Sequence, residues 1–284
     1  MTDIVAPALR YHGAKFRLAP WIMSFFPEHQ CYVEAFGGAA GVLLQKARVY
    51  AEVYNDLDGE IVTFFRCLRD PALRERLIEA ITLTPYARAE FMQAWEPASD
   101  PIEIARRLAI RAQMGFGSAG ATKGATGFRI DTKRAYGTAQ ALWASYPEAI
   151  AAAGERFSGV LVENRPAVDV MRQHDGAQTL HFVDPPYMHE TRSMRGSNRC
   201  YRHEMTDADH ADLLEHLKIL KGYVVLSGYD SPLYSDILRG WQKSTTQSRI
   251  SSGRGTALRV ECVWINPSCA AALRREQAQQ VMFA

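Results

Sequence analysis

The chain has 284 residues, of which 47% are hydrophobic, and its 33 basic and 31 acidic side chains give a formal net charge of +2. This composition supplies a buried core and excludes a globally disordered chain, while the small net charge argues against a protein that coats nucleic acid indiscriminately. No window approaches the roughly 18 apolar residues of a transmembrane helix, so we expect no membrane span. The N-terminus lacks a basic start followed by an apolar run, so we expect no signal peptide. Five widely spaced cysteines predict no disulfide framework and favour a reducing cytoplasm.

The first α/β pattern runs from residue 31 to residue 56. The short apolar run CYVEAF predicts a strand, and the sequence GGAAG breaks it. The stretch AGVLLQKARVY then has helical periodicity, and AEVYND predicts a second strand. We therefore expect a strand, a glycine turn, a helix and a second strand in this order.

The middle of the chain has a different character. From about residue 59 to residue 111 apolar residues recur at helical spacing, and ARRLAIRAQM is the last clear helix of this region. Residues 115–140 are rich in glycine and in basic side chains, which is more typical of loops or hairpins than of a packed helix.

Alternation of strands and helices then returns. The segments GVLVENR, TLHFV, YVVLSGY and RVECVWIN predict strands, and Thr206 with Asp209 predicts the capped start of a helix that ends by Gly222. The chain length suggests about two folding units. We therefore predict a doubly wound, mostly parallel α/β sheet that carries an inserted, largely helical domain over residues 71–158.

The glycines after the first strand point to a bound ligand. Gly37 and Gly38 let the backbone approach a ligand closely, and the helix expected after them would offer unpaired amides. Asp56 follows the second strand, where a carboxylate can accept hydrogen bonds from both hydroxyls of a ribose. These features fit an adenosine-containing cofactor, while the glycine spacing disfavours a nicotinamide dinucleotide.

The sequence Asp184-Pro185-Pro186-Tyr187 directly follows the apolar strand TLHFV. Two prolines fix the backbone and remove two amide donors, so that carbonyl groups face whatever lies above the strand end. The Asp184 carboxylate and the Pro185 carbonyl are acceptors suited to an exocyclic amine, and the Tyr187 ring is a stacking surface for a base. Taken alone, these four residues are as consistent with a proline turn that contains a helix-capping aspartate as with a site that binds a base.

Basic side chains outnumber acidic ones by seven to two between residues 101 and 140. This excess indicates either a surface that faces a polyanion or a solvated helix face followed by a loop. A second arginine-rich stretch, which contains Arg195, follows the Asp-Pro-Pro-Tyr sequence and predicts either a loop that orders over nucleic acid or a simple exposed loop.

In combination and in this order, the motifs resemble those of the Dam-like DNA adenine-N6 methyltransferases with the alpha motif order. The segment RYHGAK, residues 10–15, resembles the aromatic-x-Gly-Gly-Lys motif of that family, with Ala14 in place of the second glycine. Residues 33–41 resemble its cofactor loop, and residues 55–58 its ribose-binding acid. Residues 184–187 resemble its catalytic tetrapeptide, and residues 263–266 its late strand.

The resemblance implies S-adenosylmethionine as methyl donor and a flipped-out adenine as acceptor. It implies catalytic roles for Asp184, Pro185 and Tyr187. The expected cofactor-binding residues are Tyr11, Lys15, Phe36, Gly37, Gly38, Asp56 and Asp184. The basic residues expected to contact DNA are Arg111, Lys123, Arg129, Lys133, Arg134 and Arg195.

The resemblance also implies a class I, Rossmann-like methyltransferase fold. Residues 1–70 and 159–266 would form the cofactor-binding catalytic domain, residues 71–158 the target-recognition domain, and residues 267–284 a C-terminal tail. We expect double-stranded DNA as the partner of a cytoplasmic monomer in a bacterial or phage setting, with no membrane, metal or obligate protein partner.

Three other functions remain open from the sequence. N4-cytosine methylation also modifies an exocyclic amine, although aspartate before Pro-Pro-Tyr favours adenine. An RNA base methyltransferase and a non-catalytic, cofactor-binding DNA-recognition protein are the other two. A zinc site is not predicted because the scattered histidines and Cys200 lack paired close spacings; these histidines are His181, His189, His203, His210 and His216.

Overall fold

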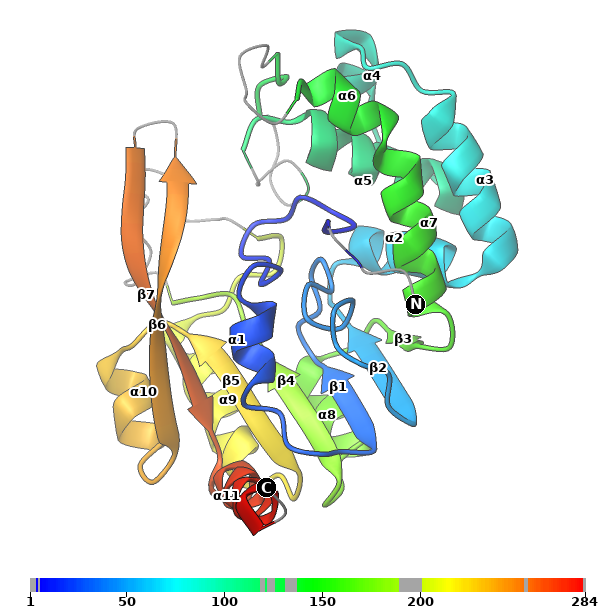
Figure 1. Ribbon diagram of the computed structural model, residues 1–284. Helices are drawn as coiled ribbons and strands as arrows, with labels where there is room; N and C mark the ends of the chain where they lie inside the picture. The colour runs from blue at the N-terminus through cyan, green and yellow to red at the C-terminus, as the bar shows by residue number, and fades with distance from the viewer. Residues whose placement is uncertain are drawn as a thin grey trace.

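The computed structural model of the protein describes residues 4, 6–117, 121, 126–130, 137–188, 201–252 and 255–282. Figure 1 shows an open sheet with a group of helices beyond one of its ends. The described strands are β1 (Cys31–Glu34), β2 (Ala51–Asn55), β3 (Leu161–Glu163), β4 (Thr179–Val183), β5 (Tyr223–Gly228), β6 (Gln242–Ser252) and β7 (Gly255–Ile265).

The described helices fall into two groups and two outliers. One group lies between β2 and β3: α2 (Gly59–Arg69), α3 (Pro71–Thr82), α4 (Arg88–Gln93), α5 (Pro101–Met114), α6 (Ala139–Ala144) and α7 (Tyr146–Phe157). A second group alternates with the later strands: α8 (Ala167–Gln173), α9 (Asp207–Lys218) and α10 (Pro232–Ile237). The outliers are α1 (Ala19–Met23) and α11 (Pro267–Met282), near the two ends of the chain.

The sheet has seven strands in the order β3-β2-β1-β4-β5-β7-β6. The pairs β3·β2, β2·β1, β1·β4 and β4·β5 are parallel, whereas β7 is antiparallel to both β5 and β6. The strand order reverses between β1 and β4, where ligands of doubly wound sheets bind beyond the carboxyl ends of the strands. This topology confirms the predicted doubly wound, mostly parallel sheet.

Successive side chains of the central strands enter two separate hydrophobic cores, as the alternation of a strand requires. Tyr32 and Phe182 pack with α2, α5 and α7 on one face. Val33 and Val183 pack with α8, α9 and α10 on the other. Burial on both faces explains why β4 reads as a continuous apolar run in the sequence.

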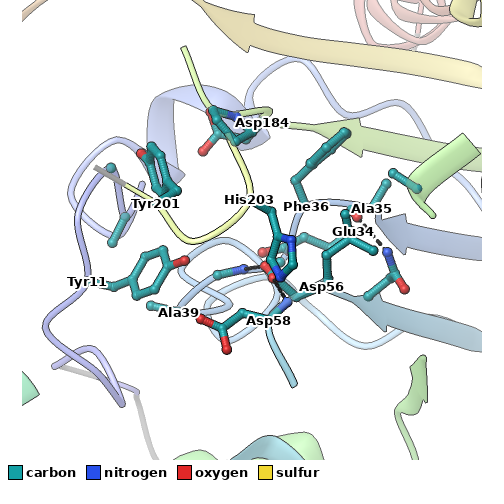
Figure 2. A pocket seen from close by; sticks show the side chains of 18 of the residues that line it. Tyr11, Glu34, Ala35, Phe36, Ala39, Asp56, Asp58, Asp184, Tyr201 and His203 are labelled. Atoms are coloured by element: carbon teal, nitrogen blue, oxygen red, sulfur yellow. Dashed lines mark hydrogen bonds between the residues drawn. The ribbon is translucent and has the colours of Figure 1, made fainter. Parts of the chain in front are cut away.

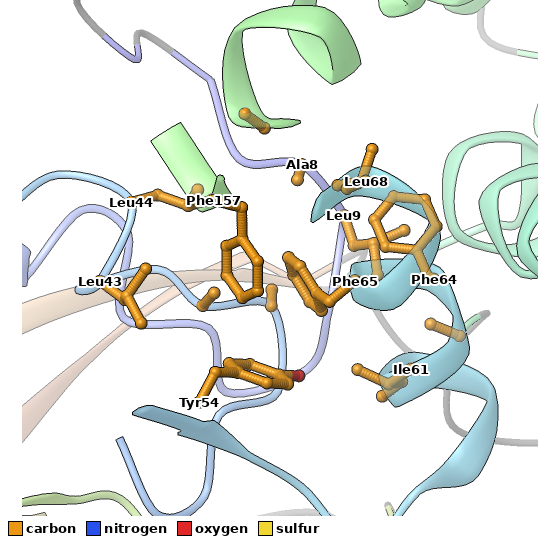
Figure 3. Close-up of a cluster of buried hydrophobic side chains, with 14 of the residues drawn as sticks. Ala8, Leu9, Leu43, Leu44, Tyr54, Ile61, Phe64, Phe65, Leu68 and Phe157 are labelled. Atoms are coloured by element: carbon orange, nitrogen blue, oxygen red, sulfur yellow. The ribbon is translucent and has the colours of Figure 1, made fainter. Parts of the chain in front are cut away.

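The helices between β2 and β3 share a core with the sheet. The Phe65 ring of α2 lies with its centroid 4.7 Å from that of Tyr54 on β2 and 4.7 Å from that of Phe157 on α7 (Figure 3). Aromatic pairs of this kind are each worth about 0.5–1.5 kcal/mol beyond their buried area. Helices α2 and α7 therefore pack against Tyr54 of β2, whose ring also lies against Gly37 of the glycine turn.

The prediction of a helix directly after the glycines is wrong. The described backbone from residue 41 to residue 46 forms successive turns, and Ala40 has a positive φ of 52°. The Glu34 carboxylate accepts a hydrogen bond from the Leu43 amide at 2.9 Å. This buried side chain takes over the role of a helical carbonyl, so helical periodicity is present without a regular helix.

Strand β6 and helix α11, near the C-terminus, were not expected from the sequence, whereas the start of α9 was expected. Strand β6 is polar except for Ile250, and the predicted tail is mostly helix α11. At the start of this helix, Asn266 Oδ1 accepts a hydrogen bond from the Cys269 amide at 3.0 Å. The start of α9 confirms the prediction, because Thr206 and Asp209 form a reciprocal capping box.

Candidate active site

A cavity opens at the carboxyl ends of β1, β2 and β4, where the strand order reverses. It contains about 890 Å³ of empty space, part of which is open to solvent. Figure 2 shows carboxylates and aromatic rings from several segments around it. Seven residues predicted to bind the cofactor line this one cavity: Tyr11, Lys15, Phe36, Gly37, Gly38, Asp56 and Asp184.

The turn after β1 requires its glycines. A Cβ at Gly37 would collide with the ring of Tyr54, which is fully buried and donates a hydrogen bond to the Gly38 carbonyl at 2.7 Å. Gly38 has a φ of +47°, and a Cβ there would lie 3.0 Å from Cε1 of Tyr11. Glycine therefore allows the turn and the Tyr11 ring to approach each other across the cavity.

Asp56 stands at the end of β2 and holds two loops. Its Oδ2 accepts a hydrogen bond from the Gly38 amide at 2.8 Å, and its Oδ1 accepts one from the Asp58 amide at 2.8 Å. Burial raises the pKa of Asp56, while these two amides oppose that shift. Each carboxylate oxygen retains a second lone-pair direction for a ligand.

Glu34 was not singled out in the sequence, although it lies in the cofactor-loop motif. It lines the cavity at 2% exposure and accepts hydrogen bonds from the Tyr32 hydroxyl at 2.6 Å and the Leu43 amide at 2.9 Å. Burial raises the pKa of Glu34 to about 8. A buried acid after an apolar strand carries no local signal that distinguishes it from a surface one.

Asp184 and Lys15 form an ion pair at the other end of the cavity. Lys15 Nζ lies 2.9 Å from Asp184 Oδ2 and donates to the Gly13 carbonyl at 2.8 Å. The second oxygen, Asp184 Oδ1, is buried and has no hydrogen-bond partner among the described residues. Burial raises the pKa of Asp184, and the Lys15 ammonium opposes that shift.

The turn that carries Lys15 tolerates Ala14 where the related motif has glycine. Gly13 has a φ of +76°, whereas Ala14 is not among the described residues with a positive φ. A Cβ at Gly13 would collide with the hydroxyl of Tyr201. The glycine that the turn needs is therefore the first of the pair, and Ala14 leaves Lys15 in contact with Asp184.

Tyr187 ends the tetrapeptide and is not among the residues that line the cavity. Its hydroxyl donates to Glu261 Oε2 at 2.9 Å and lies 3.3 Å from Ser227 Oγ. Lys15 Nζ lies 4.6 Å from the centroid of its ring, and the Tyr229 ring packs against it at 4.5 Å. The predicted catalytic sequence therefore ends in an aromatic ring that is fixed from several directions.

Residues 201–205, which follow the tetrapeptide, close one side of the cavity. Arg202 pairs with Glu60 Oε2 at 2.6 Å and with Asp58 Oδ1 at 3.4 Å. The Tyr201 ring packs 6.2 Å from the ring of Tyr11. None of these contacts was predicted, because they join segments far apart in the sequence.

Two of the six residues expected to contact DNA lie inside the protein. Arg111 is 4% exposed, pairs with Glu60 and donates to the Ala94 carbonyl at 2.9 Å. Arg129 is also 4% exposed, and its carbonyl accepts a hydrogen bond from Tyr86 at 2.6 Å. Burial argues against phosphate contact by either side chain. The other four lie outside the described residues: Lys123, Lys133, Arg134 and Arg195.

The cavity combines a carboxylate-rich wall with apolar surfaces. Most of its charged side chains are acidic, which favours a cationic ligand. Within the described ranges, no group of three or more histidine, cysteine, aspartate or glutamate side chains has the arrangement of a metal site. Nor does any helix in that part of the chain have the length and apolarity needed to cross a membrane.

Comparison with known proteins assigns the chain to a family. A search of curated proteins gives no match. A family model, described as D12 class N6 adenine-specific DNA methyltransferase, matches residues 11–252, which include the glycine turn, Asp56 and the Asp184 strand end. The methyl-acceptor chemistry and the class I fold expected from the sequence agree with this match. The chain therefore belongs to the D12 class of N6 adenine-specific DNA methyltransferases, enzymes that transfer a methyl group to adenine N6 in DNA.

Proposed function

We propose that this enzyme uses S-adenosylmethionine as its methyl donor and acts on an adenine turned out of a DNA duplex. Asp184 binds the exocyclic amine in this proposal. The observation that carries it is the position of Asp184, which lines the cavity and has a buried oxygen with no hydrogen-bond partner in the described part of the chain. A buried acceptor of this kind requires a donor, and N6 of adenine supplies one.

The residues around the cavity fit S-adenosylmethionine in charge and shape. Asp56, Asp58 and Glu204 line it and suit the positive charges of the donor's amino group and sulfonium. When bound, the donor supplies a methyl group on a cationic sulfur. Asp56 has acceptor capacity for ribose hydroxyls, and the Tyr11 and Phe36 rings form apolar walls.

Asp184 raises the reactivity of the target amine. The lone pair of an aromatic amine is delocalised into the ring, which makes N6 a poor nucleophile. Hydrogen bonds from N6 to Asp184 and to the Pro185 carbonyl favour a more tetrahedral nitrogen and stabilise the positive charge that develops on it. Placement of amine and methyl in line contributes further, because orientation is worth about 7–11 kcal/mol in favourable cases.

Lys15 holds Asp184 for this task. The 2.9 Å ion pair fixes one carboxylate oxygen and favours the ionised form, which leaves the second oxygen to accept from the amine. Lys15 is only 6% exposed, so the pair has little competition from water. Its role is therefore to orient and ionise Asp184 rather than to contact the transferred methyl group.

The adenine must leave the base stack to reach Asp184. Extrusion of a base costs a few kcal/mol, and stacking on the Tyr187 ring offsets part of this cost. Duplex binding is assigned to the inserted region over residues 71–158 and to four basic residues: Lys123, Lys133, Arg134 and Arg195. Phosphate contacts of this kind position the duplex without reading its sequence.

Cofactor titration tests the first part of the proposal. S-adenosylmethionine is titrated calorimetrically into the wild-type protein, Asp56→Ala and the control Asp236→Asn, whose carboxylate is an exposed partner of Arg239. We expect saturable binding by the wild type and the control, and binding at least about tenfold weaker in Asp56→Ala, since one lost charge-assisted hydrogen bond is worth about 1.5–3 kcal/mol. No binding by the wild-type protein, or unchanged binding in Asp56→Ala, would contradict the assignment.

Fluorescence tests the second part of the proposal, in which the target adenine leaves the duplex. The modified positions in unmethylated phage DNA are mapped first, and 2-aminopurine then replaces the target adenine in a duplex that contains the mapped site. Extrusion predicts a large rise in 2-aminopurine fluorescence when the protein binds, because the base loses its stacking neighbours. An unchanged signal from a saturated complex would exclude extrusion.

A further inference from the structure

Glu261 is a buried acid that contacts Tyr187 and has no role in the mechanism proposed above. It lies on β7, is 6% exposed, and falls outside the residues that match the family. Along this strand Leu258 and Val260 are exposed, whereas Arg259 and Glu261 contact Tyr229 and Tyr187. The alternation of the strand therefore directs Glu261 to the Asp-Pro-Pro-Tyr sequence.

Both oxygens of Glu261 are engaged. Oε2 accepts the Tyr187 hydroxyl at 2.9 Å, and Oε1 accepts the Ser248 hydroxyl of β6 at 3.3 Å. A carboxylate that is buried needs such donors, because an unpaired buried charge is strongly unfavourable. Two strands of the antiparallel edge thus hold this carboxylate, and it in turn holds the Tyr187 hydroxyl.

The orientation of the Tyr187 ring depends on the hydrogen bond that its hydroxyl donates to Glu261. Tyr187 follows two prolines and therefore lies outside any strand or helix. Lys15 Nζ and the Tyr229 ring contact the aromatic body at 4.6 Å and 4.5 Å. These contacts limit where the ring lies, and the directional hydrogen bond to Glu261 fixes its rotation. Burial also raises the pKa of Tyr187, so the hydroxyl stays protonated and donates.

We propose that Glu261 is a positioning residue for methyl transfer, which holds Tyr187 at the angle needed to stack on the target adenine. This inference rests on the proposed stacking role of Tyr187. Glu261 does not touch the reacting atoms and acts only through the tyrosine. Loss of its hydrogen bond should impair turnover more than cofactor binding, because Glu261 does not line the cofactor cavity.

The test compares Glu261→Leu, Glu261→Gln and the control Glu215→Gln, whose carboxylate lies in an exposed pair with Lys218, in steady-state methylation of unmethylated phage DNA. Glutamine keeps an acceptor for Tyr187, whereas leucine does not. We expect kcat to fall about 10- to 100-fold in Glu261→Leu, as for other small misplacements of a reacting group. The KM for S-adenosylmethionine should stay within about twofold of wild type. Glu261→Gln and Glu215→Gln should retain most of kcat.

A second variant keeps the inference testable if Glu261→Leu does not fold. Tyr187→Phe removes the same hydrogen bond from its other end and keeps the ring, so it should lower kcat about 10- to 100-fold while the KM for S-adenosylmethionine stays within about twofold of wild type. An unchanged kcat in Tyr187→Phe would overturn the inference. So would an unchanged kcat in Glu261→Leu, equal losses with leucine and glutamine, or a matching rise in the KM for S-adenosylmethionine.

The fluorescence of 2-aminopurine distinguishes a failure of this inference from a failure of the proposed function. If the wild-type protein gives no signal with the mapped site, base extrusion itself fails. If the wild type gives the signal and Glu261→Leu gives the same signal with unchanged kcat, only the role of Glu261 fails. The expected result is a strong signal from the wild type and a weaker or altered signal from Glu261→Leu.

Discussion

At the scale of single residues, the ion pair between Lys15 and Asp184 predicts a pH dependence of turnover. Burial raises the pKa of Asp184, and the Lys15 ammonium opposes that shift. In the proposed mechanism the ionised carboxylate accepts a hydrogen bond from the amine, so we expect activity to fall as pH drops through this pKa. In Lys15→Gln we expect the acid limb of the kcat profile to move up by about one pH unit or more, because an opposite charge at this distance favours ionisation.

The measurement is a pH–rate profile with saturating substrates, and Lys218→Gln serves as control because its ammonium lies in an exposed pair with Glu215. The control should titrate like the wild type. An acid limb that stays in place or moves to lower pH in Lys15→Gln would contradict the role given to Lys15.

Glu34 predicts a pH dependence of stability instead. Its pKa in the folded protein is about 8, above the ordinary value of 4.5, because the side chain is buried. The folded state therefore binds this proton more tightly than the unfolded chain does. The stability contributed by Glu34 is present below pH 4.5 and is lost as pH rises towards 8.

Glu34→Gln stays neutral and keeps an acceptor for Tyr32 and Leu43. We expect it to match the wild type closely at pH 5 and to exceed its unfolding free energy by roughly 2 to 4 kcal/mol at pH 8.5, in the absence of cofactor. Urea unfolding at both pH values measures this, with the exposed Glu215→Gln as control. A constant difference between the two pH values would show that Glu34 does not titrate as described.

The residues of the site were predictable only where a motif made them so. Gly37, Asp56 and Asp184 each follow an apolar strand, and strand ends meet at one edge of a parallel sheet. Glu261 and Arg202 reach the site through contacts across long stretches of sequence, which no local pattern records. Arg111 is buried and pairs with Glu60, which argues against its predicted contact with DNA, and charge density along a sequence does not reveal such burial.

At the scale of elements, the segment 201–205 is held to the start of α2 by Arg202. Its contacts with Asp58 and Glu60 keep His203, Glu204 and Met205 at the wall of the cavity. Arg202 is 40% exposed, so each pair is individually weak. In Arg202→Ala we expect S-adenosylmethionine to bind about two- to tenfold more weakly, with little change in melting temperature.

Calorimetric titration of the cofactor measures this effect. Lys218→Ala removes a similarly exposed ion pair on α9 and should bind the cofactor like the wild type. Equal affinity in Arg202→Ala and the control would mean that the segment needs no ionic contact to stay in place.

The elements themselves were predicted where apolar periodicity and capping chemistry agree. The start of α9 and the strand β4 are of this kind. The polar strand β6 has no such pattern, since its partner β7 supplies the pairing that makes it a strand. The turn after Gly41 shows the reverse case, in which helical periodicity is overridden by the buried carboxylate of Glu34.

At the scale of the whole molecule, the net charge of +2 is small, so we propose that a few basic residues supply the affinity for DNA. We expect the affinity for a DNA duplex to fall steeply with salt, and the slope of log K against log salt to become less negative by about 2 in Lys133→Glu/Arg134→Glu. Arg111→Ala should instead lower stability, because it leaves Glu60 with one fewer cationic partner. Anisotropy titrations from 50 to about 300 mM salt measure the slopes. An identical slope in the double variant would contradict phosphate contact by this pair.

The most direct test of the account is methyl transfer from labelled S-adenosylmethionine to unmethylated phage DNA, followed by nucleoside analysis. Wild type and Asp184→Asn are run together, because asparagine keeps the shape of the side chain while removing its charge. The account predicts label in N6-methyladenine with the wild type and a loss of at least about 100-fold with Asp184→Asn, whose fold stays intact. Label in another nucleoside, or wild-type rates from the folded Asp184→Asn protein, would contradict it.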